Sequence, residues 1–363
     1  MSFSSSTPSI YPSHGGNIFY YAKKLGIHYK DLIDLSASVN PLVKDFLQEK
    51  LLHLWENLEF YPDPEGESLC NILAEIYSLE RENFLLGHGS LELWQYFLLY
   101  FLPRGCHIFL PEPTFVGYRK ILSQRKDFQI TAPFSLTPED HLNHLKNFMK
   151  KKYKNKAVIL CHPNNPTGAL FPKEELLSII DKNPQVWFLI DEAFIEFKES
   201  ASFLPHIQHF SNLYIFRSFT KFYGLAGTRL GYLAGNKKIL SQLKKFLPTW
   251  NTDTLSQILA EKLLLDENFK KTSLDFFLKQ KTIMEETLRA LGVYYFPSVA
   301  NFYLLKIEEG RRLYRWLLEE KRILVRSCHN FVGLSEDYLR VSLKRTEENQ
   351  KFLEAIEEWL KGF

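Results

Sequence analysis

The sequence predicts an α/β fold with a mainly parallel sheet, helices on both of its faces, and a second, smaller α/β domain. Two observations lead to this prediction. Continuous apolar runs, such as residues 157–162 and 186–190, alternate with stretches of helical periodicity, which is typical of parallel strands buried on both faces. Polar residues follow directly after these runs, at the edge where ligands bind in such sheets.

Length and composition limit the possible classes of protein. The 363 residues are 45% hydrophobic and 24% charged, as in an ordinary globular protein. A net charge of +3 is too small to indicate nucleic-acid binding. The four cysteines form no CxxC pair, so no zinc site or disulfide framework is implied. Residues 1–13 lack the features of a signal peptide, and no apolar run could span a membrane, so we expect a cytoplasmic protein.

The chain divides into three predicted parts. Residues 1–44 form an N-terminal segment that we expect to pack with the small domain and the active site, and they include a short strand within residues 32–41. Residues 45–250 form the large domain. Residues 251–363 form the small domain, where long helical stretches are followed by short strands, two of which each carry one arginine, Arg326 and Arg340.

Lys221 is the most unusual residue of the predicted large domain. It follows the apolar run of residues 213–217 and lies among small and aromatic residues, although lysines normally occupy solvated surfaces. Burial lowers the pKa of an amine and makes it a nucleophile that can form a Schiff base with a carbonyl cofactor. Ser218, Thr220 and Arg229 lie close by in sequence and would form an anion site beside the lysine.

A second candidate anion site is the glycine-rich turn of residues 87–90. A strand precedes this turn and a helix follows it, so free backbone N–H groups and the helix dipole would face a ligand. The turn is neither a P-loop nor a dinucleotide-binding fingerprint. His88 reads more readily as a turn residue than as a catalyst. The turn at His14 and Gly15 could let the backbone approach a ligand closely, or could be a plain glycine-rich turn.

Three further residues follow strand ends. Asn165 and Asp191 each come after a buried strand, and with Lys221 they would share one edge of the sheet. Phe115 also lies just past a strand end, where a planar cofactor could stack on it, although most aromatic residues belong to the core.

Together these motifs are more specific than any one of them. Asn-Pro-Thr-Gly at 165–168, Asp-Glu-Ala-Phe at 191–194, Ser-x-x-Lys at 218–221, Arg229 and Arg340 resemble the fold-type I pyridoxal-phosphate enzymes. The resemblance covers residue 14 to the end of the chain. It implies the fold of those enzymes, pyridoxal 5′-phosphate as cofactor, and a homodimer with shared active sites.

The resemblance also implies roles for single residues. Lys221 would be the Schiff-base lysine and the proton-transfer group, Asp191 would pair with the pyridine nitrogen, and Asn165 would donate to the phenolic oxygen. Phe194 stands where many of these enzymes have a tyrosine that also bonds this oxygen. Further cofactor contacts are implied for the phosphate site, the stacking aromatic and a tyrosine from the neighbouring subunit: Gly89, Ser90, Leu91, Ser218, Thr220, Arg229, Phe115 and Tyr61. Leu91 replaces a small hydroxyl residue.

Two reactions remain open within this superfamily. Residues 14–17, 34–41, 191–194 and 326–334 look more like threonine-phosphate decarboxylases, which make aminopropanol phosphate for the nucleotide loop of cobamides. The alternative is a histidinol-phosphate aminotransferase. Ser38 and Ser327 depart from the decarboxylase pattern and leave open whether O-phosphothreonine or O-phosphoserine is the substrate. The residues expected to bind the phosphorylated amino acid are His14, Gly15, Ser38, Asn165, Arg326 and Arg340.

A reading from another class is a non-catalytic regulator built on the same fold. Such regulators carry an added helix-turn-helix domain, for which the residues before His14 are too few. Lys221, Asp191 and Arg340 are all present, so we expect an enzyme.

Overall fold

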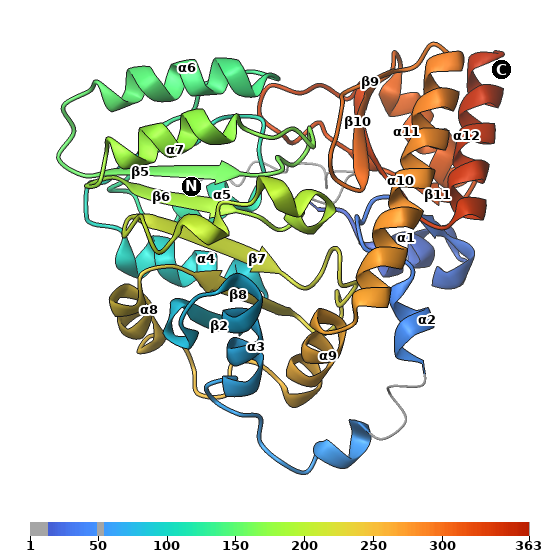
Figure 1. The fold of residues 1–363 in the computed structure, drawn as a ribbon. Coiled ribbons are helices and arrows are strands. Elements are labelled where there is room, and N and C mark those ends of the chain that lie inside the picture. The colour runs from blue at the N-terminus through green and yellow to red at the C-terminus, as the bar shows by residue number, and fades with distance from the viewer. Residues whose placement is uncertain (1–13, 49–53, 363) are drawn as a thin grey trace, which may run out of the picture.

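The computed structural model describes residues 14–48 and 54–362, so the expectation for residues 1–13 lies outside the described residues. A seven-stranded sheet forms the centre of the large domain (Figure 1), in the order β2-β8-β7-β6-β5-β3-β4. The strands from β7 to β4 are parallel, whereas β8 runs antiparallel to both β7 and β2. The predicted mainly parallel sheet is therefore confirmed. Its strands are β2 (Phe84–His88), β3 (His107–Phe109), β4 (Gln129–Thr131), β5 (Lys156–Cys161), β6 (Trp187–Asp191), β7 (Leu213–Ser218) and β8 (Leu230–Ala234).

Helices cover both faces of this sheet, because β5, β6 and β7 are buried throughout and present apolar side chains to each face in turn. Side chains of α3, α6, α7 and α9 pack against one face, and those of α4, α5 and α8 against the other. The bounds are α3 (Glu67–Tyr77), α4 (Ser90–Tyr96), continued by the π-helix η4 (Phe97–Phe101), α5 (Gly117–Leu122), α6 (Pro138–Met149), α7 (Lys173–Asp181), α8 (Lys237–Lys244) and α9 (Thr254–Leu264), with short 3₁₀ turns η2 (Leu54–Asn57), η3 (Arg81–Asn83), η5 (Ile195–Ala201) and η6 (Leu204–His206).

The smaller domain is an antiparallel sheet of order β12-β13-β10-β9. Its helices lie beside the large sheet in Figure 1, with the long α10 along the boundary between the two parts. The N-terminal α1 and the strand β1 join this domain, because β1 pairs in parallel with β11. The elements are α1 (Ile18–Leu25), η1 (Tyr29–Asp31), β1 (Ile33–Asp34), α2 (Val43–Leu47), α10 (Glu267–Ala290), β9 (Tyr294–Tyr295), β10 (Phe302–Lys306), α11 (Gly310–Glu319), β11 (Ile323–Leu324), β12 (Arg326–Ser327), β13 (Tyr338–Ser342) and α12 (Thr346–Leu360).

Two predicted strands differ from the structure. The strand expected within residues 32–41 is only the two residues of β1, because the following chain turns toward the site. The strand expected at residues 323–326 is two strands, since the chain leaves β1 after Leu324 and joins β13 at Arg326. This change of sheet places Arg326 directly opposite Arg340.

The packing of α9 bears on the domain boundary, which stays a prediction. Leu259 and Leu263 of this helix lie in the core beneath the large sheet, although both follow residue 250.

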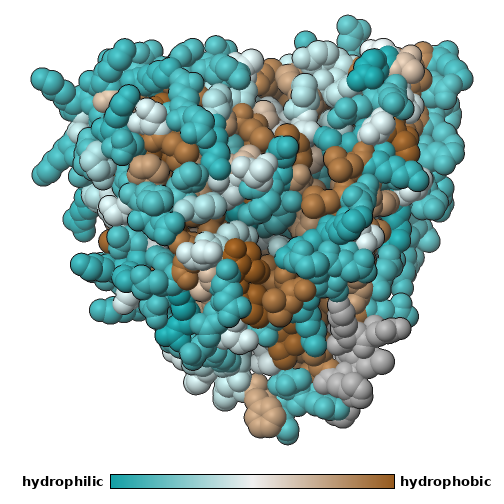
Figure 2. Space-filling view, viewed as in Figure 1, coloured by the Kyte–Doolittle hydropathy of each residue, from teal (hydrophilic) through white to brown (hydrophobic). Residues whose placement is uncertain are grey.

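Hydrophilic residues cover most of the face in Figure 2, and hydrophobic ones gather along its middle. Among residues 14–48 and 54–362, we find no helix whose length and apolar character would allow it to cross a membrane.

Candidate active site

A cavity of about 270 Å³ lies at the carboxyl ends of β5, β6 and β7, between the large sheet and the small domain. The sequence-predicted residues that line it come from both domains and from the N-terminal segment. They are His14, Gly15, Ser38, Ser90, Leu91, Phe115, Asn165, Asp191, Phe194, Ser218, Thr220, Lys221, Arg229, Arg326 and Arg340. Gly89 and Tyr61 do not line the cavity.

Lys221 lies just past the end of β7, where a hydrogen bond from Asn40 N to its carbonyl ties it to the N-terminal segment. Burial lowers the pKa of Lys221 to about 8, and the positive charges of Arg340 and Arg229 add to this effect, whereas Asp191 opposes it. The Lys221 Nζ lies 5.5 Å from the centre of the Phe194 ring. A substantial fraction of this amine is therefore neutral near pH 8 and able to act as a nucleophile.

Asp191 ends β6 and receives two hydrogen bonds. The Tyr118 hydroxyl donates to its Oδ2 at 2.5 Å, and the Ala193 N–H donates to its Oδ1 at 3.0 Å. Burial raises the pKa of Asp191, and these two donors oppose that rise. Tyr118 was missed by the sequence analysis, because in α5 it reads as a core aromatic; the one available signal is that a buried phenol needs a hydrogen-bond partner.

An anion cradle lies around Arg229, whose backbone has φ of 55°. Its guanidinium donates to Thr220 Oγ1 at 3.4 Å, and the Thr220 N–H donates to Ser218 Oγ at 3.2 Å. Gly89 borders this cradle without lining the cavity, since a Cβ there would lie 2.7 Å from an Arg229 nitrogen. Glycine at position 89 therefore leaves room for the guanidinium.

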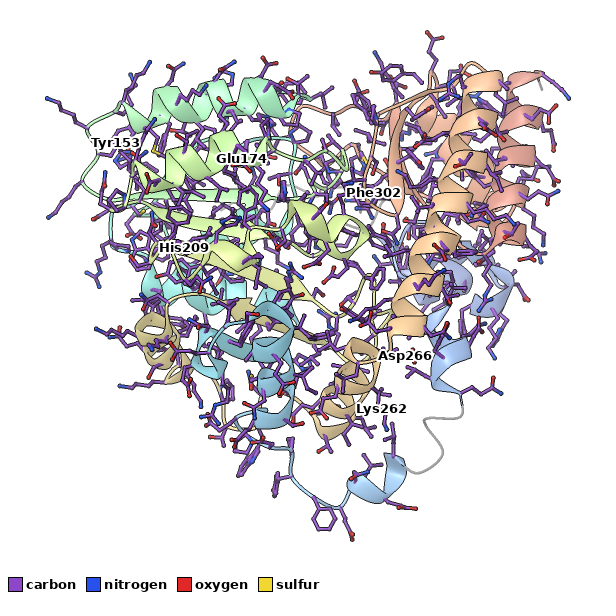
Figure 3. All side chains as sticks on the ribbon, in the orientation of Figure 1. Tyr153, Glu174, His209, Lys262, Asp266 and Phe302 are labelled. Atoms are coloured by element: carbon purple, nitrogen blue, oxygen red, sulfur yellow. The ribbon has the colours of Figure 1, made fainter. Side chains whose placement is uncertain are left out.

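The small domain contributes two arginines from adjacent strands. Arg340 is buried and donates to Asn165 Oδ1 at 2.5 Å and to the Ser36 carbonyl at 2.9 Å. Its Nε has no hydrogen-bond partner among the described residues. Its guanidinium lies 5.0 Å from the ring centre of Phe302, which Figure 3 shows on β10 at the side facing the large domain. Burial lowers the pKa of Arg340 to about 10, because it destabilises the charged guanidinium. An anionic ligand would offset this cost, so the site favours one.

Arg326 is held by its own loop. It donates to Asn330 Oδ1 at 2.6 Å and to the Ser327 carbonyl. His14 lies near it, and burial together with the charge of Arg326 lowers the pKa of this imidazole. Ser38 forms a hydroxyl pair with Ser342 at 2.7 Å. Gly15 has no room for a side chain, because a Cβ there would overlap the Ser36 carbonyl.

Tyr61 lies apart from the cavity. Its ring stacks on Trp250 at 4.4 Å between centroids, and its side chain is 77% exposed. Other residues that line the cavity were not predicted as site residues, because they are apolar or small, although four of them lie within motifs noted in the sequence. They are Ser36, Ala37, Trp94, Val116, Cys161, Ala193 and Phe331.

The charge lining the cavity is unbalanced. Among the described residues that line it, Asp191 is the only acid, whereas Lys221, Arg229, Arg326 and Arg340 are basic. Such a site favours ligands with more than one anionic group.

These residues fit pyridoxal 5′-phosphate. Arg229, Thr220 and Ser218 offer donors for a phosphate, Asp191 offers a carboxylate for the ring nitrogen, and the amine of Lys221 suits the aldehyde. Gly89 leaves Arg229 room beside this phosphate site. The fit therefore rests on the set of donors and on the cradle that they form.

Relatives found by comparison with known proteins carry different names, as two of them show. The chain is 33% identical over 360 residues to the adenosylcobalamin biosynthesis bifunctional protein CobDQ of Leptospira interrogans, a match that covers 95% of this chain and 41% of that protein. The chain thus spans less than half the length of this relative. It is also 33% identical over 320 residues to the histidinol-phosphate aminotransferase of Pyrococcus furiosus, covering 86% of this chain and 88% of that enzyme.

Among solved structures, the L-threonine-O-3-phosphate decarboxylase of Porphyromonas gingivalis is similar, with a TM-score of 0.75 and 25% identity over 88% of this chain and 96% of that one. Residues 30–356 match the family described as aminotransferase class I and II, whose enzymes use pyridoxal 5′-phosphate. With most of its length matched and the site suited to that cofactor, the chain belongs to the aminotransferase class I and II family.

Proposed function

We propose that the protein is a pyridoxal-phosphate-dependent decarboxylase of an O-phospho-L-amino acid, either O-phospho-L-threonine or O-phospho-L-serine. It would release carbon dioxide and an amino-alcohol phosphate, which serves the nucleotide loop of cobamides. The observation that carries this proposal is the pair of arginines on β12 and β13.

Arg326 and Arg340 are direct partners across two antiparallel strands. Like charges directly opposite one another destabilise a sheet, and an anion bound between them offsets that cost. An O-phospho-L-amino acid carries a carboxylate and a phosphate, so it matches both arginines while Arg229 remains for the cofactor phosphate. His14, Gly15, Ser38 and Asn165 would complete the substrate site.

The residues of the large domain would hold the cofactor. Phe115 would stack on the ring, while Ser90, Leu91 and Gly89 would border the phosphate through their backbone. Bound at this site, the cofactor supplies an electron sink for the bond that breaks at the substrate Cα. Lys221 would deliver the proton that replaces the carboxylate at that carbon, and Asp191 would keep the ring nitrogen protonated.

The choice between reactions depends on which substrate bond is aligned with the cofactor ring. A decarboxylase must hold the carboxylate out of the ring plane, whereas an aminotransferase holds the Cα–H bond there. Orientation of this kind is worth several kcal/mol. The two arginines and Asn165, which bonds Arg340 at 2.5 Å, would fix the carboxylate in the required position.

The names of the relatives support both readings. The similarity of this chain to a decarboxylase and to an adenosylcobalamin-biosynthesis protein favours the proposal. A histidinol-phosphate aminotransferase at the same 33% identity favours amino transfer as the alternative.

We also propose that the protein acts as a homodimer. Tyr61 would reach the cofactor phosphate of the neighbouring subunit. Its exposed position outside the cavity of its own chain supports this role.

The test is carbon dioxide release by the purified, cofactor-loaded protein, with O-phospho-L-threonine or O-phospho-L-serine and no keto acid. We expect turnover with one of them, and the faster substrate identifies the product. Unphosphorylated L-threonine is the matched control and should react poorly. Absence of carbon dioxide, together with amino transfer from histidinol phosphate to 2-oxoglutarate, would instead establish the alternative.

A further inference from the structure

A buried network of charged groups lies directly behind the site. Arg217 is completely buried, and its Nη2 bonds Glu192 Oε2 at 2.8 Å and Glu199 Oε1 at 2.9 Å. Its Nη1 donates to the Tyr77 hydroxyl at 2.7 Å. Ser202 Oγ accepts from Arg217 at 2.6 Å and donates to Glu192 at 2.7 Å. The network thus joins β7, the end of β6, the η5 turn and the last residue of α3.

This network and the site share the same two strand ends. Successive side chains of a strand point to opposite faces, so Asp191 and Ser218 line the cavity while Glu192 and Arg217 face the other way. Two network residues, Glu192 and Arg217, are thus bonded through the backbone to the cavity residues Asp191 and Ser218. A further hydrogen bond, from Glu192 N to Phe216 O at 2.8 Å, joins the two strand ends.

The network holds more acids than bases. Three carboxylates, those of the buried Glu192 and Glu196 and of the exposed Glu199, surround the single guanidinium of Arg217. Glu196 is the most weakly paired, since its Oε1 lies 3.9 Å from Arg217 and its Oε2 has no hydrogen-bond partner among the described residues. Glu192 already balances the charge of Arg217, so a further negative charge on the buried Glu196 is costly. The arrangement therefore favours a neutral Glu196.

We propose that Arg217, Glu192 and protonated Glu196 are positioning residues for the cofactor. By joining the ends of β6 and β7 they fix the spacing between Asp191 and Ser218, and ionisation of Glu196 loosens this connection and weakens cofactor binding. The inference rests on the cofactor-binding roles proposed above for Asp191 and Ser218.

The groups around Glu196 give the sign of the pH dependence. Burial raises the pKa of Glu196 to about 8, Arg217 opposes the rise, and Glu199 and Glu192 add to it. The phenols on the other elements that face the network, Tyr77, Tyr223 and Tyr232, have pKa values raised by burial and stay neutral in this range. The pKa of Glu196 is higher in the folded state than in the unfolded chain, so the folded state binds more protons between about pH 4.5 and about pH 8. The free energy of unfolding therefore falls as the pH rises through this range.

The test compares the wild type with Glu196→Gln, which mimics the protonated carboxyl at all pH values. Cofactor dissociation constants are measured by absorbance from pH 6.5 to 9.5. We expect the two proteins to have equal dissociation constants at pH 6.5. At pH 9.5 the wild type should bind about tenfold more weakly than Glu196→Gln, because a tenfold difference corresponds to a change of about one unit in the pKa of Glu196 on cofactor binding. Lys221 titrates in both proteins, so the ratio isolates Glu196.

The matched control is Glu174→Gln, the same change at an exposed position of α7, which Figure 3 labels. It should reproduce the wild-type pH profile. Urea unfolding of the cofactor-free wild type and Glu196→Gln gives a second measurement. The free energy of unfolding of Glu196→Gln should increase relative to that of wild type between pH 5 and pH 8.

The outcomes separate the possibilities. An equal pH dependence of cofactor binding in the wild type and Glu196→Gln overturns the proposal, whether or not the unfolding curves differ. Absence of any cofactor binding to wild-type protein would instead overturn the proposed function, because the network is tested only through that site.

Discussion

Charged groups lie on both sides of the ends of β6 and β7, those on the cavity side coming in part from the small domain, and the two sides differ in how the charges are balanced. On the cavity side, Arg340 bonds only neutral oxygens among the described residues and keeps one nitrogen unbonded. On the other side, Arg217 is bonded to two carboxylates, a phenol and a hydroxyl. A buried arginine without a charged partner indicates a place for a ligand, whereas one with its partners supplied by the protein indicates a structural connection.

The largest expected effect is on the cavity side, at Lys221. Lys221→Ala should remove the visible absorbance band of the bound cofactor and lower carbon dioxide release about a thousandfold or more, because it removes both the covalent anchor and the proton-transfer group. Absorbance spectroscopy and a product assay measure the two effects. Lys237→Ala, which breaks only the exposed ion pair with Glu80, is the control. A band that persists in Lys221→Ala would show that another lysine holds the cofactor.

Among these variants, breaking the network around Arg217 should have the largest effect on stability. Arg217→Met leaves Glu192 buried without its cation, so we expect the free energy of unfolding to fall by about 3–5 kcal/mol. Urea titration of the apo-protein measures this change.

The double variant Arg217→Met with Glu192→Gln removes both charges and should recover much of that loss. A single variant as stable as the wild type would mean that the network contributes nothing to the fold, and the contrast between the two faces would disappear.

On the cavity side, removal of an arginine should act on the reaction more than on the fold. Arg340→Ala should lower kcat/KM about a hundredfold through loss of a charge-assisted contact with the substrate carboxylate, with the cofactor band retained. Steady-state kinetics and absorbance measure both quantities.

Arg340→Lys keeps the charge without the planar pair of donors, so its activity should lie between those of Arg340→Ala and wild type. Unchanged kinetics in Arg340→Ala would remove this residue from the substrate site.

The two faces also differ in how far the sequence predicts them. The cavity residues Asn165, Asp191 and Lys221 follow buried strands, so their shared edge could be expected from the strand pattern alone, and the family resemblance gave them roles. Arg217 was read as the last residue of an apolar strand, because periodicity does not reveal the partners of a buried charge. Its partners lie 15 to 140 residues away in sequence, beyond the reach of any local pattern.

The opposition of Arg326 and Arg340 was equally hidden. Each was expected on a strand, but their pairing depends on the chain leaving one sheet after Leu324 and entering another. Tyr118 was missed for a related reason, since its hydroxyl meets Asp191 only through the packing of α5 on the sheet. Local sequence therefore predicts which groups lie at a strand end, and tertiary packing decides what they contact.

The smallest expected effect concerns Phe194, which borders the cavity without offering a hydrogen bond. Its ring is buried, packs edge-on against Phe302 at 4.9 Å and lies 5.5 Å from Lys221 Nζ. Phe194→Tyr adds a donor that would stabilise the deprotonated form of the bound cofactor, so the pH midpoint of its visible band should fall by about one unit. Phe194→Leu adds no donor and should not show this fall. An unchanged midpoint in Phe194→Tyr would mean that the new hydroxyl does not reach the cofactor.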